Sequence, residues 1–197
     1  MIKGVYMNIL FLGNDINPLI DWLKEQKENV LQTDDKISVD YIKVNSIDFI
    51  VSYGYRHIIK KDVIDTLTNK CINLHVSYLP FNRGADPNLW SFIEGTPKGV
   101  TIHYLDEGVD TGNIIVQKEV HFDIEKETLK SSYSVLQDEI QKLFKENWYT
   151  IKEGKCKSIV QPNEGTKHYV KDKNRIQDKL VKGWDTRVSS LVNLDLQ

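Results

Sequence analysis

The chain has 197 residues, 40% of them hydrophobic, a length that suits one globular domain with or without a short appendage. Lys and Arg total 26 against 28 Asp and Glu, so the net charge of -2 gives no electrostatic reason to expect binding to nucleic acid. The first apolar run, Ile9 to Leu12, is too short to span a bilayer or to form the core of a signal peptide. The two cysteines form no CxxC motif, which argues against a thiol redox motif or a structural zinc site. We therefore expect a soluble cytoplasmic protein.

Strand and helix patterns alternate over the first part of the chain. A helix is predicted to begin behind Asn17 as the N-cap, with Pro18 at its first position. The other elements are a strand over 7–13, a loop over 33–36, a short strand over 41–44, a strand over 47–52, a helix over 61–69 and a strand over 71–77. This alternation favours a parallel sheet covered by helices, with ligands in the crevice beyond the carboxyl ends of the strands.

The second part of the chain has a different pattern. A short helix is expected around 90–93, two antiparallel strands over 99–106 and 113–122, and a long amphipathic helix over 128–151. We predict that residues 7–154 form the catalytic domain, that translation starts at Met1 or Met7, and that 155–197 form an extension for substrate binding or dimerisation. Within this extension we predict a stretch of extended backbone followed by one charged helix. Its last apolar side chains are expected to pack on the body or on a second subunit: Trp184, Leu191, Val192 and Leu194.

Polar side chains that could take part in a reaction lie in two segments. Asn73 and His75 lie two residues apart on a predicted strand and so face the same side. The glycine-punctuated loop between the later two strands supplies Asp110, which we expect at the same end of the sheet. An amide, an imidazole and a carboxylate suit attack by a nucleophile on a carbonyl group, and a nearby Asp is expected to raise the pKa of His75. Taken singly, each residue also has an ordinary structural interpretation, as a turn-former or a packed histidine.

Longer motifs carry a resemblance. The segments NLHVSYLPFNRG and GVTIHYLDEGVDTGNIIVQ resemble the formyltransferase family, whose members take a formyl group from 10-formyltetrahydrofolate. PNLWSFIEGTPKGVTIHYLDEGVDTG and GTKHYVKD resemble the members that formylate amino sugars carried on a nucleotide. The sequence departs from the family at Val76, usually proline, and at Lys167, often tyrosine. The resemblance implies a Rossmann-like α/β fold, with a mostly parallel sheet flanked by helices and a short C-terminal appendage.

The resemblance also implies roles for individual residues. The catalytic residues would be Asn73, His75 and Asp110, with no metal. The folate would lie between two loops, with cofactor-binding residues Tyr55, Arg56, His57, Ile58, Asp106, Glu107, Gly108 and Val109. The substrate-binding residues would be Ser77, Asn82, Arg83, Gly84, His168 and Tyr169. His103 and His121 are expected to be surface or packing residues, and Trp90 and Phe92 to belong to the core.

The function implied is N-formylation of a dTDP-linked 4-amino-4,6-dideoxyhexose for a surface polysaccharide such as lipopolysaccharide, by a homodimer. Two other folate reactions are alternatives: hydrolysis of formyltetrahydrofolate, which would need the same trio, and formylation of glycinamide ribonucleotide. The segment GNDINP after the first strand is poorly suited to the phosphate of that ribonucleotide. The chain is shorter than relatives that formylate initiator tRNA and carry a C-terminal barrel. A non-catalytic module that binds folate or a nucleotide is an alternative from another class.

Overall fold

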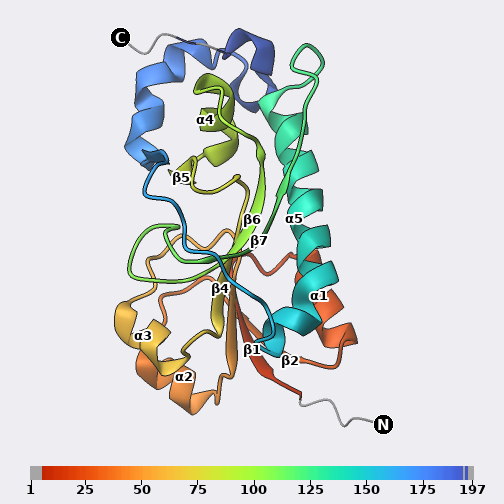
Figure 1. Cartoon of the computed structure of the whole chain (residues 1–197), viewed down its shortest axis with the longest axis vertical. Coiled ribbons are helices and arrows are strands. Elements are labelled where there is room, and N and C mark those ends of the chain that lie inside the picture. Colours follow the sequence, from red (N-terminus) through yellow and green to blue (C-terminus); the bar gives the residue numbers. More distant parts are fainter. Residues whose placement is uncertain (1–5, 193, 195–197) are drawn as a thin grey trace.

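The computed structural model describes residues 6–192 and residue 194. Its main sheet has six strands in the order β2-β1-β3-β4-β6-β7. Strands β1 to β4 run parallel, whereas β6 is antiparallel to both β4 and β7. The strands are β1 (Asn8–Leu12), β2 (Asn29–Thr33), β3 (Phe49–Ser52), β4 (Cys71–His75), β6 (Gly99–Tyr104) and β7 (Ile114–Glu119). The predicted fold class, a mostly parallel sheet flanked by helices, is therefore confirmed (Figure 1).

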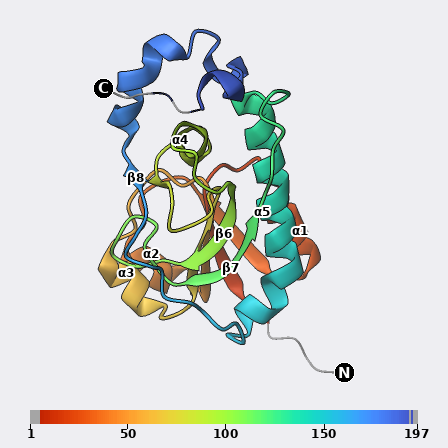
Figure 2. The same cartoon turned by 45° about the horizontal axis from the view of Figure 1, so that its top comes forward.

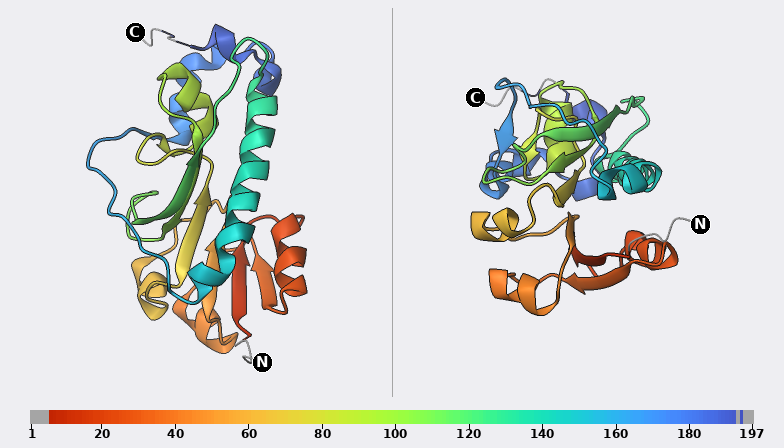
Figure 3. Two further views of the ribbon diagram at one scale, coloured as in Figure 1. Left: turned by 45° about the vertical axis from the view of Figure 1, so that its right-hand side comes forward. Right: turned by 60° about the horizontal axis from the view of Figure 1, so that its bottom comes forward.

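Helices cover both faces of this sheet. Alternate residues of β1 enter different clusters: Ile9 and Phe11 pack beneath one helix layer, and Leu10 and Leu12 pack beneath the other. Helices α1 (Pro18–Glu25) and α5 (Leu129–Lys152) form the first layer, and α2 (Val39–Val44) and α3 (Lys61–Thr66) form the second (Figure 3). A strand that is buried on both faces has a continuous run of apolar residues in its sequence, and this run predicts β1.

Capping residues fix where the helices begin. The side chain of Asn17 accepts a hydrogen bond from the backbone N–H of Leu19, with Pro18 at the first position of α1, as predicted. The side chain of Thr128 accepts from the backbone N–H of Ser131 at the start of α5, whose buried side chains recur at helical spacing.

The strand predicted over residues 41–44 is wrong. Residues 41–44, expected as a strand, belong to α2, because Ser38 caps that helix by accepting from the N–H of Tyr41. The strand beside β1 is instead β2, which lies at the edge of the sheet and is too exposed to show an apolar run.

The C-terminal segment shares a core with the body of the protein. Short strand β8 (Lys167–His168) pairs in parallel with β5 (Arg83–Gly84), and 3₁₀ helices follow at Val170–Lys179, Gly183–Asp185 and Val188–Ser190. Buried residues Ile176, Val188 and Leu191 pack against α4 (Pro87–Ile93) and the start of α5 (Figure 2). The predicted charged helix is thus a 3₁₀ helix.

The apolar residues near the C-terminus behave differently from one another. Leu191 is buried, Val192 is half-buried and Leu194 packs against the same cluster, so the expected packing on the body is confirmed for Leu191 and Leu194. Trp184 is exposed over 47% of its surface. Met1 and residues 195–197, which enter the start-site and extension predictions, lie outside the described residues. Within the described part of the chain, no helix combines the length and apolar character needed to cross a membrane.

Candidate active site

The polar side chains of β4 lie on the face of the sheet turned away from α1 and α5. Ile72 and Leu74 enter the core beneath those helices, so Asn73 and His75 project from the opposite face. In the antiparallel pairing with β6, Asn73 lies directly opposite His103, and His75 opposite Thr101. Directly opposed residues place their side chains close together on one face.

Asp110 reaches this cluster from the connection between β6 and β7. Its Oδ1 accepts a hydrogen bond from Asn73 Nδ2 at 3.1 Å, and its Oδ2 accepts one from the backbone N–H of Gly84 at 2.8 Å. Oδ2 lies 3.7 Å from His75 Nδ1, and Oδ1 lies 3.4 Å from His103 Nε2. Asp110 therefore contacts both of the other residues predicted to be catalytic, Asn73 and His75, and the imidazole of His103 joins the cluster.

The partners of the two imidazoles fix where their hydrogens lie. His75 Nε2 donates to the carbonyl oxygen of Asn82 at 3.2 Å, since a carbonyl can only accept. For the same reason His103 Nδ1 donates to the carbonyl oxygen of Tyr104 at 2.8 Å. His103 Nε2 lies within hydrogen-bond distance of Asn73 Nδ2, at 3.3 Å, and of Asp110 Oδ1, at 3.4 Å, and His75 Nδ1 is turned toward Asp110.

The charges in the cluster follow from burial and from these neighbours. Burial lowers the pKa of His75 below its ordinary value of 6.5 and, with His103, outweighs the opposing effects of Asp110 and the Asn82 carbonyl. The expectation that Asp110 raises this pKa overall is thus wrong, because it ignored the loss of solvent. Burial by itself raises the pKa of Asp110, but the two imidazoles and the Gly84 N–H prevail and hold it well below its usual range. Near pH 7, His75 is neutral and Asp110 is ionised.

His103 was expected to be a surface or packing residue, and the structure instead places it in the cluster with 1% of its surface exposed. Its alternation with Val100 and Ile102 along β6 was the available signal, because it assigns His103 to the opposite face. The register in which β6 pairs with β4 could not be predicted from the sequence. The side chain of His121, by contrast, is 87% exposed, in accord with its prediction.

The two loops predicted to hold the folate follow different strands of the main sheet. Residues 55–58 follow β3, residues 106–109 follow β6, and Lys61 at the start of α3 forms an ion pair with Glu107 at 2.8 Å. The side chain of Ile58 is 80% exposed, and Tyr55 donates its hydroxyl hydrogen to the Asp35 carbonyl at 2.6 Å. Asp106 accepts from the N–H of Gly108, which tightens the second loop. Arg56 and Glu107 are exposed, and His57 and Val109 are half-buried.

The residues predicted to bind substrate divide into two groups. Ser77 and Asn82 are buried and use their side chains within the protein: Ser77 donates to the Phe81 carbonyl, and Asn82 donates to Glu94 and Thr166. The others lie along the pairing of β5 with β8 or just beyond it: Arg83, Gly84, His168 and Tyr169.

The environment of these residues differs along the strand pair. The ring of His168 stacks on Trp90 with centroids 4.0 Å apart, and its Nε2 lies 2.8 Å from Glu94. Trp90 and Phe92 are buried, as predicted. Tyr169 is the most exposed of the six predicted substrate contacts.

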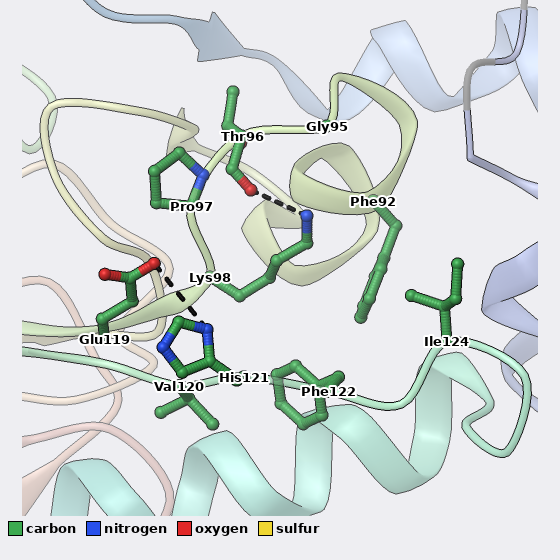
Figure 4. Close-up of a pocket in the computed structure, with 10 residues that line it drawn as sticks. All are labelled: Phe92, Gly95, Thr96, Pro97, Lys98, Glu119, Val120, His121, Phe122 and Ile124. Atoms are coloured by element: carbon green, nitrogen blue, oxygen red, sulfur yellow. Dashed lines mark hydrogen bonds and ion pairs between the residues drawn. The ribbon is translucent and has the colours of Figure 1, made fainter.

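Two surface cavities lie away from the cluster. One, of about 410 Å³, is lined by Asn14, Asp15, Gln32, Asp34, Gly54 and Arg56, at the carboxyl ends of β1 to β3. The other, of about 360 Å³, lies between α4 and the segment after β7, where Lys98 donates to the Thr96 carbonyl and His121 approaches Glu119 (Figure 4). Neither is lined by the predicted trio. Among the described residues, no group of three or more His, Cys, Asp or Glu side chains is arranged to hold a metal ion.

Comparison with known proteins identifies the family. The formyl transferase family model matches residues 16–147. The crystal structure of the formyltransferase PseJ from Anoxybacillus kamchatkensis, in complex with UDP-4,6-dideoxy-4-formamido-L-AltNAc and tetrahydrofolate, is 48% identical, with a TM-score of 0.91. The alignment covers 94% of this chain and 98% of that one. A 4-N formyltransferase from Francisella tularensis shares the fold at 24% identity, with a TM-score of 0.71 over 86% of this chain and 79% of that one.

Curated relatives belong to the same family but are named for a different acceptor, methionyl-tRNA. Methionyl-tRNA formyltransferase from Clostridioides difficile is 38% identical over 131 residues, which are 66% of this chain and 42% of that protein. The chain thus spans less than half the length of this relative. Because the family model covers more than half of the residues, the assignment does not depend on any single relative. The chain belongs to the formyltransferase family.

Proposed function

We propose that the protein transfers the formyl group of 10-formyltetrahydrofolate to the 4-amino group of a nucleotide-linked 4-amino-4,6-dideoxy sugar. The observation that carries the proposal is the cluster in which Asp110 contacts both Asn73 and His75, on a chain 48% identical to PseJ over almost its whole length. The bound product in that relative carries UDP, which favours a UDP-linked acceptor over the dTDP-linked one expected from the sequence.

The site fits a carbonyl donor and an amine acceptor. When bound, the folate supplies an electrophilic formyl carbon attached to nitrogen. The exposed apolar side chain of Ile58 and the glycine-containing loop 106–109 are the surface proposed for its flat ring. The polar groups of the cluster are an amide, two imidazoles and one ionised carboxylate.

Asn73 is the donor best placed for the carbonyl oxygen. Its two N–H groups bond Asp110 at 3.1 Å and His103 at 3.3 Å in the structure. The longer bond to His103 is the easier one to exchange, and its N–H can then donate to the oxygen as negative charge develops there. The retained bond to Asp110 would hold the amide in this orientation.

His75 and Asp110 are suited to receive the proton of the amine. The amine nitrogen forms a bond to the formyl carbon, the bond from that carbon to the folate nitrogen breaks, and a proton passes from the amine to the folate nitrogen. His75 is neutral with Nδ1 turned toward Asp110, so it can hold the proton in transit. The ionised Asp110 at 3.7 Å stabilises the imidazolium that forms.

The proposal is tested by incubating the purified protein with 10-formyltetrahydrofolate and UDP- or dTDP-linked 4-amino sugars, and measuring formylated product by mass spectrometry. We expect product with a UDP-linked acceptor, and a loss of roughly 100-fold or more in His75→Asn. His121→Asn, the same substitution at an exposed site, should retain the wild-type rate. Formate release without an acceptor would instead indicate a hydrolase, and product only with initiator tRNA would indicate the activity named for the curated relatives.

Further elements of this proposal concern the cell. The formylated sugar would enter a bacterial surface polysaccharide such as lipopolysaccharide, and the enzyme would act in the cytoplasm as a homodimer. The exposed aromatic residue Tyr149 on α5 is a candidate contact for the second subunit. Sedimentation equilibrium of the purified protein tests the dimer directly.

A further inference from the structure

Asp110 occupies a backbone conformation that needs support from its surroundings. Its φ angle is +55°, in the left-handed region that residues other than glycine seldom adopt. Its carboxylate is held by Asn73 and by the Gly84 N–H, as described above. These contacts fix the side chain but leave open what holds the backbone in place.

The backbone of Asp110 is held by Gln161, which lies between α5 and β8 with 8% of its surface exposed. Gln161 Nε2 donates to the carbonyl oxygen of Asp110 at 2.9 Å and to that of Gly112 at 2.7 Å. Its Oε1 accepts from Arg83 twice, from Nε at 3.0 Å and from Nη2 at 2.8 Å. Both donor hydrogens and the acceptor oxygen of this amide are therefore in use.

These contacts form a closed ring that runs from Asp110 through Gly84, Arg83 and Gln161 back to Asp110. Arg83 precedes Gly84 in β5, and the Gly84 N–H bonds Oδ2 of Asp110 at 2.8 Å. The Arg83–Gly84 dipeptide thus holds the side chain of Asp110 directly and its backbone through Gln161. Gln161 lies outside residues 16–147, the part of the chain that the family model matches.

We propose that Gln161 is a positioning residue, which fixes the backbone of Asp110 so that its carboxylate is held against Asn73 and His75. The inference rests on the proposed function for its meaning in catalysis. The C-terminal segment, by this account, acts on the chemistry through the carbonyl oxygens of Asp110 and Gly112 as well as through any contact with the acceptor.

Two substitutions separate positioning from simple anchoring of the segment. Gln161→Glu keeps an oxygen for Arg83 but replaces the donor to the two carbonyls with a second, charged acceptor, so the contact with Arg83 persists while those with Asp110 and Gly112 are lost. Gln161→Leu keeps similar volume and removes all of these bonds. The matched control is Gln177→Glu, the same change of charge at an exposed position of the same segment.

We expect Gln161→Glu and Gln161→Leu to lower kcat by roughly 10- to 100-fold, with KM for both substrates changed less than about threefold. Gln161→Glu should unfold at a lower temperature than the wild type, because two carbonyl oxygens lose their donor, so kcat is measured well below that transition. The control should unfold with the wild type. Wild-type kcat in Gln161→Glu, or a loss confined to KM, would overturn the proposal.

A second measurement keeps this inference distinct from the proposed function. If the wild-type protein formylates no amino sugar, the proposed function fails, and NMR titration of His75 still tests the positioning. In Gln161→Leu the pKa of His75 should fall further, because the carboxylate that raises it is no longer held at 3.7 Å. An unchanged His75 pKa in a folded Gln161→Leu variant would contradict the inference.

Discussion

The two halves of the central sheet bring polar residues together in different ways. In the parallel half, β2-β1-β3, polar residues at the carboxyl ends of the strands and in the loops after them line an open cavity of about 410 Å³. In the antiparallel half, β4-β6-β7, direct strand pairing sets Asn73 opposite His103, and the β6–β7 connection adds Asp110.

The two halves of the sheet therefore differ in how well they support a cluster of catalytic side chains. Opposed residues in an antiparallel pair lie close together on one face regardless of loop conformation, so a buried and hydrogen-bonded cluster forms there. The crevice of the parallel half holds two carboxylates, Asp15 and Asp34, near Arg56, and offers none of the same mutual support. We therefore expect substitutions in the two halves to differ in their effect on turnover.

The largest effect is expected from Asp110→Asn. This change removes the ionised carboxylate beside His75 while keeping the size of the side chain, so kcat should fall by about 10²- to 10⁴-fold. Asp34→Asn, the same substitution in the parallel half, should change kcat by less than about twofold, since this exposed group contacts none of the cluster. Steady-state kinetics with both substrates provide the measurement. Equal losses in the two variants would break the comparison between the halves.

A smaller effect is expected from pH. The pKa of His75 in the folded protein lies below 6.5, so kcat/KM should hold from pH 8 to about 6.5 and fall only at lower pH. The stability contributed by this neutral histidine is fully present above its unfolded-state pKa and is lost as pH falls below it, because the unfolded chain binds the proton first. Rate profiles and urea denaturation at pH 8 and 5.5 measure both. An acid limb centred above pH 6.5 would show that Asp110 prevails over burial.

The smallest effect is expected from Lys61→Met, which removes the exposed ion pairs of this α3 lysine with Asp65 and, in loop 106–109, with Glu107. Exposed pairs contribute little, so kcat and the melting temperature should stay at their wild-type values, and KM for the folate should rise by about twofold at most. Lys179→Met, which breaks another exposed pair, is the matched control. A folate KM raised tenfold or more in Lys61→Met alone would mean that this pair sets the spacing of the loops.

The sequence was sufficient where a signal is local. Apolar runs predicted β1, β3 and β4, and the alternation along β4 placed Asn73 and His75 on one face. Asp110 stood out because glycines and acidic residues mark its loop. The edge strand β2 was missed because an exposed strand has no apolar run, and α2 was mistaken for a strand because its few residues show no helical period.

The rest of the site depends on contacts between distant residues. The place of His103 depends on the register of β6 against β4, and that of Gln161 on the Arg83 side chain, and neither leaves a mark in the local sequence. The direction of the His75 pKa depends on how completely the imidazole is removed from water, which the residue types around it do not reveal.

The ring around Asp110 has a consequence for how the enzyme is made. A ribosome produces the chain from its N-terminus, so all six strands of the main sheet and α5 are synthesised before Gln161 and β8. Asn73, His75 and Asp110 can meet at that stage, but the contacts from Gln161 to Asp110 and from Thr166 to Asn82 must await the emerging end of the chain. Newly made chains would therefore acquire their sheet first and their finished active site last.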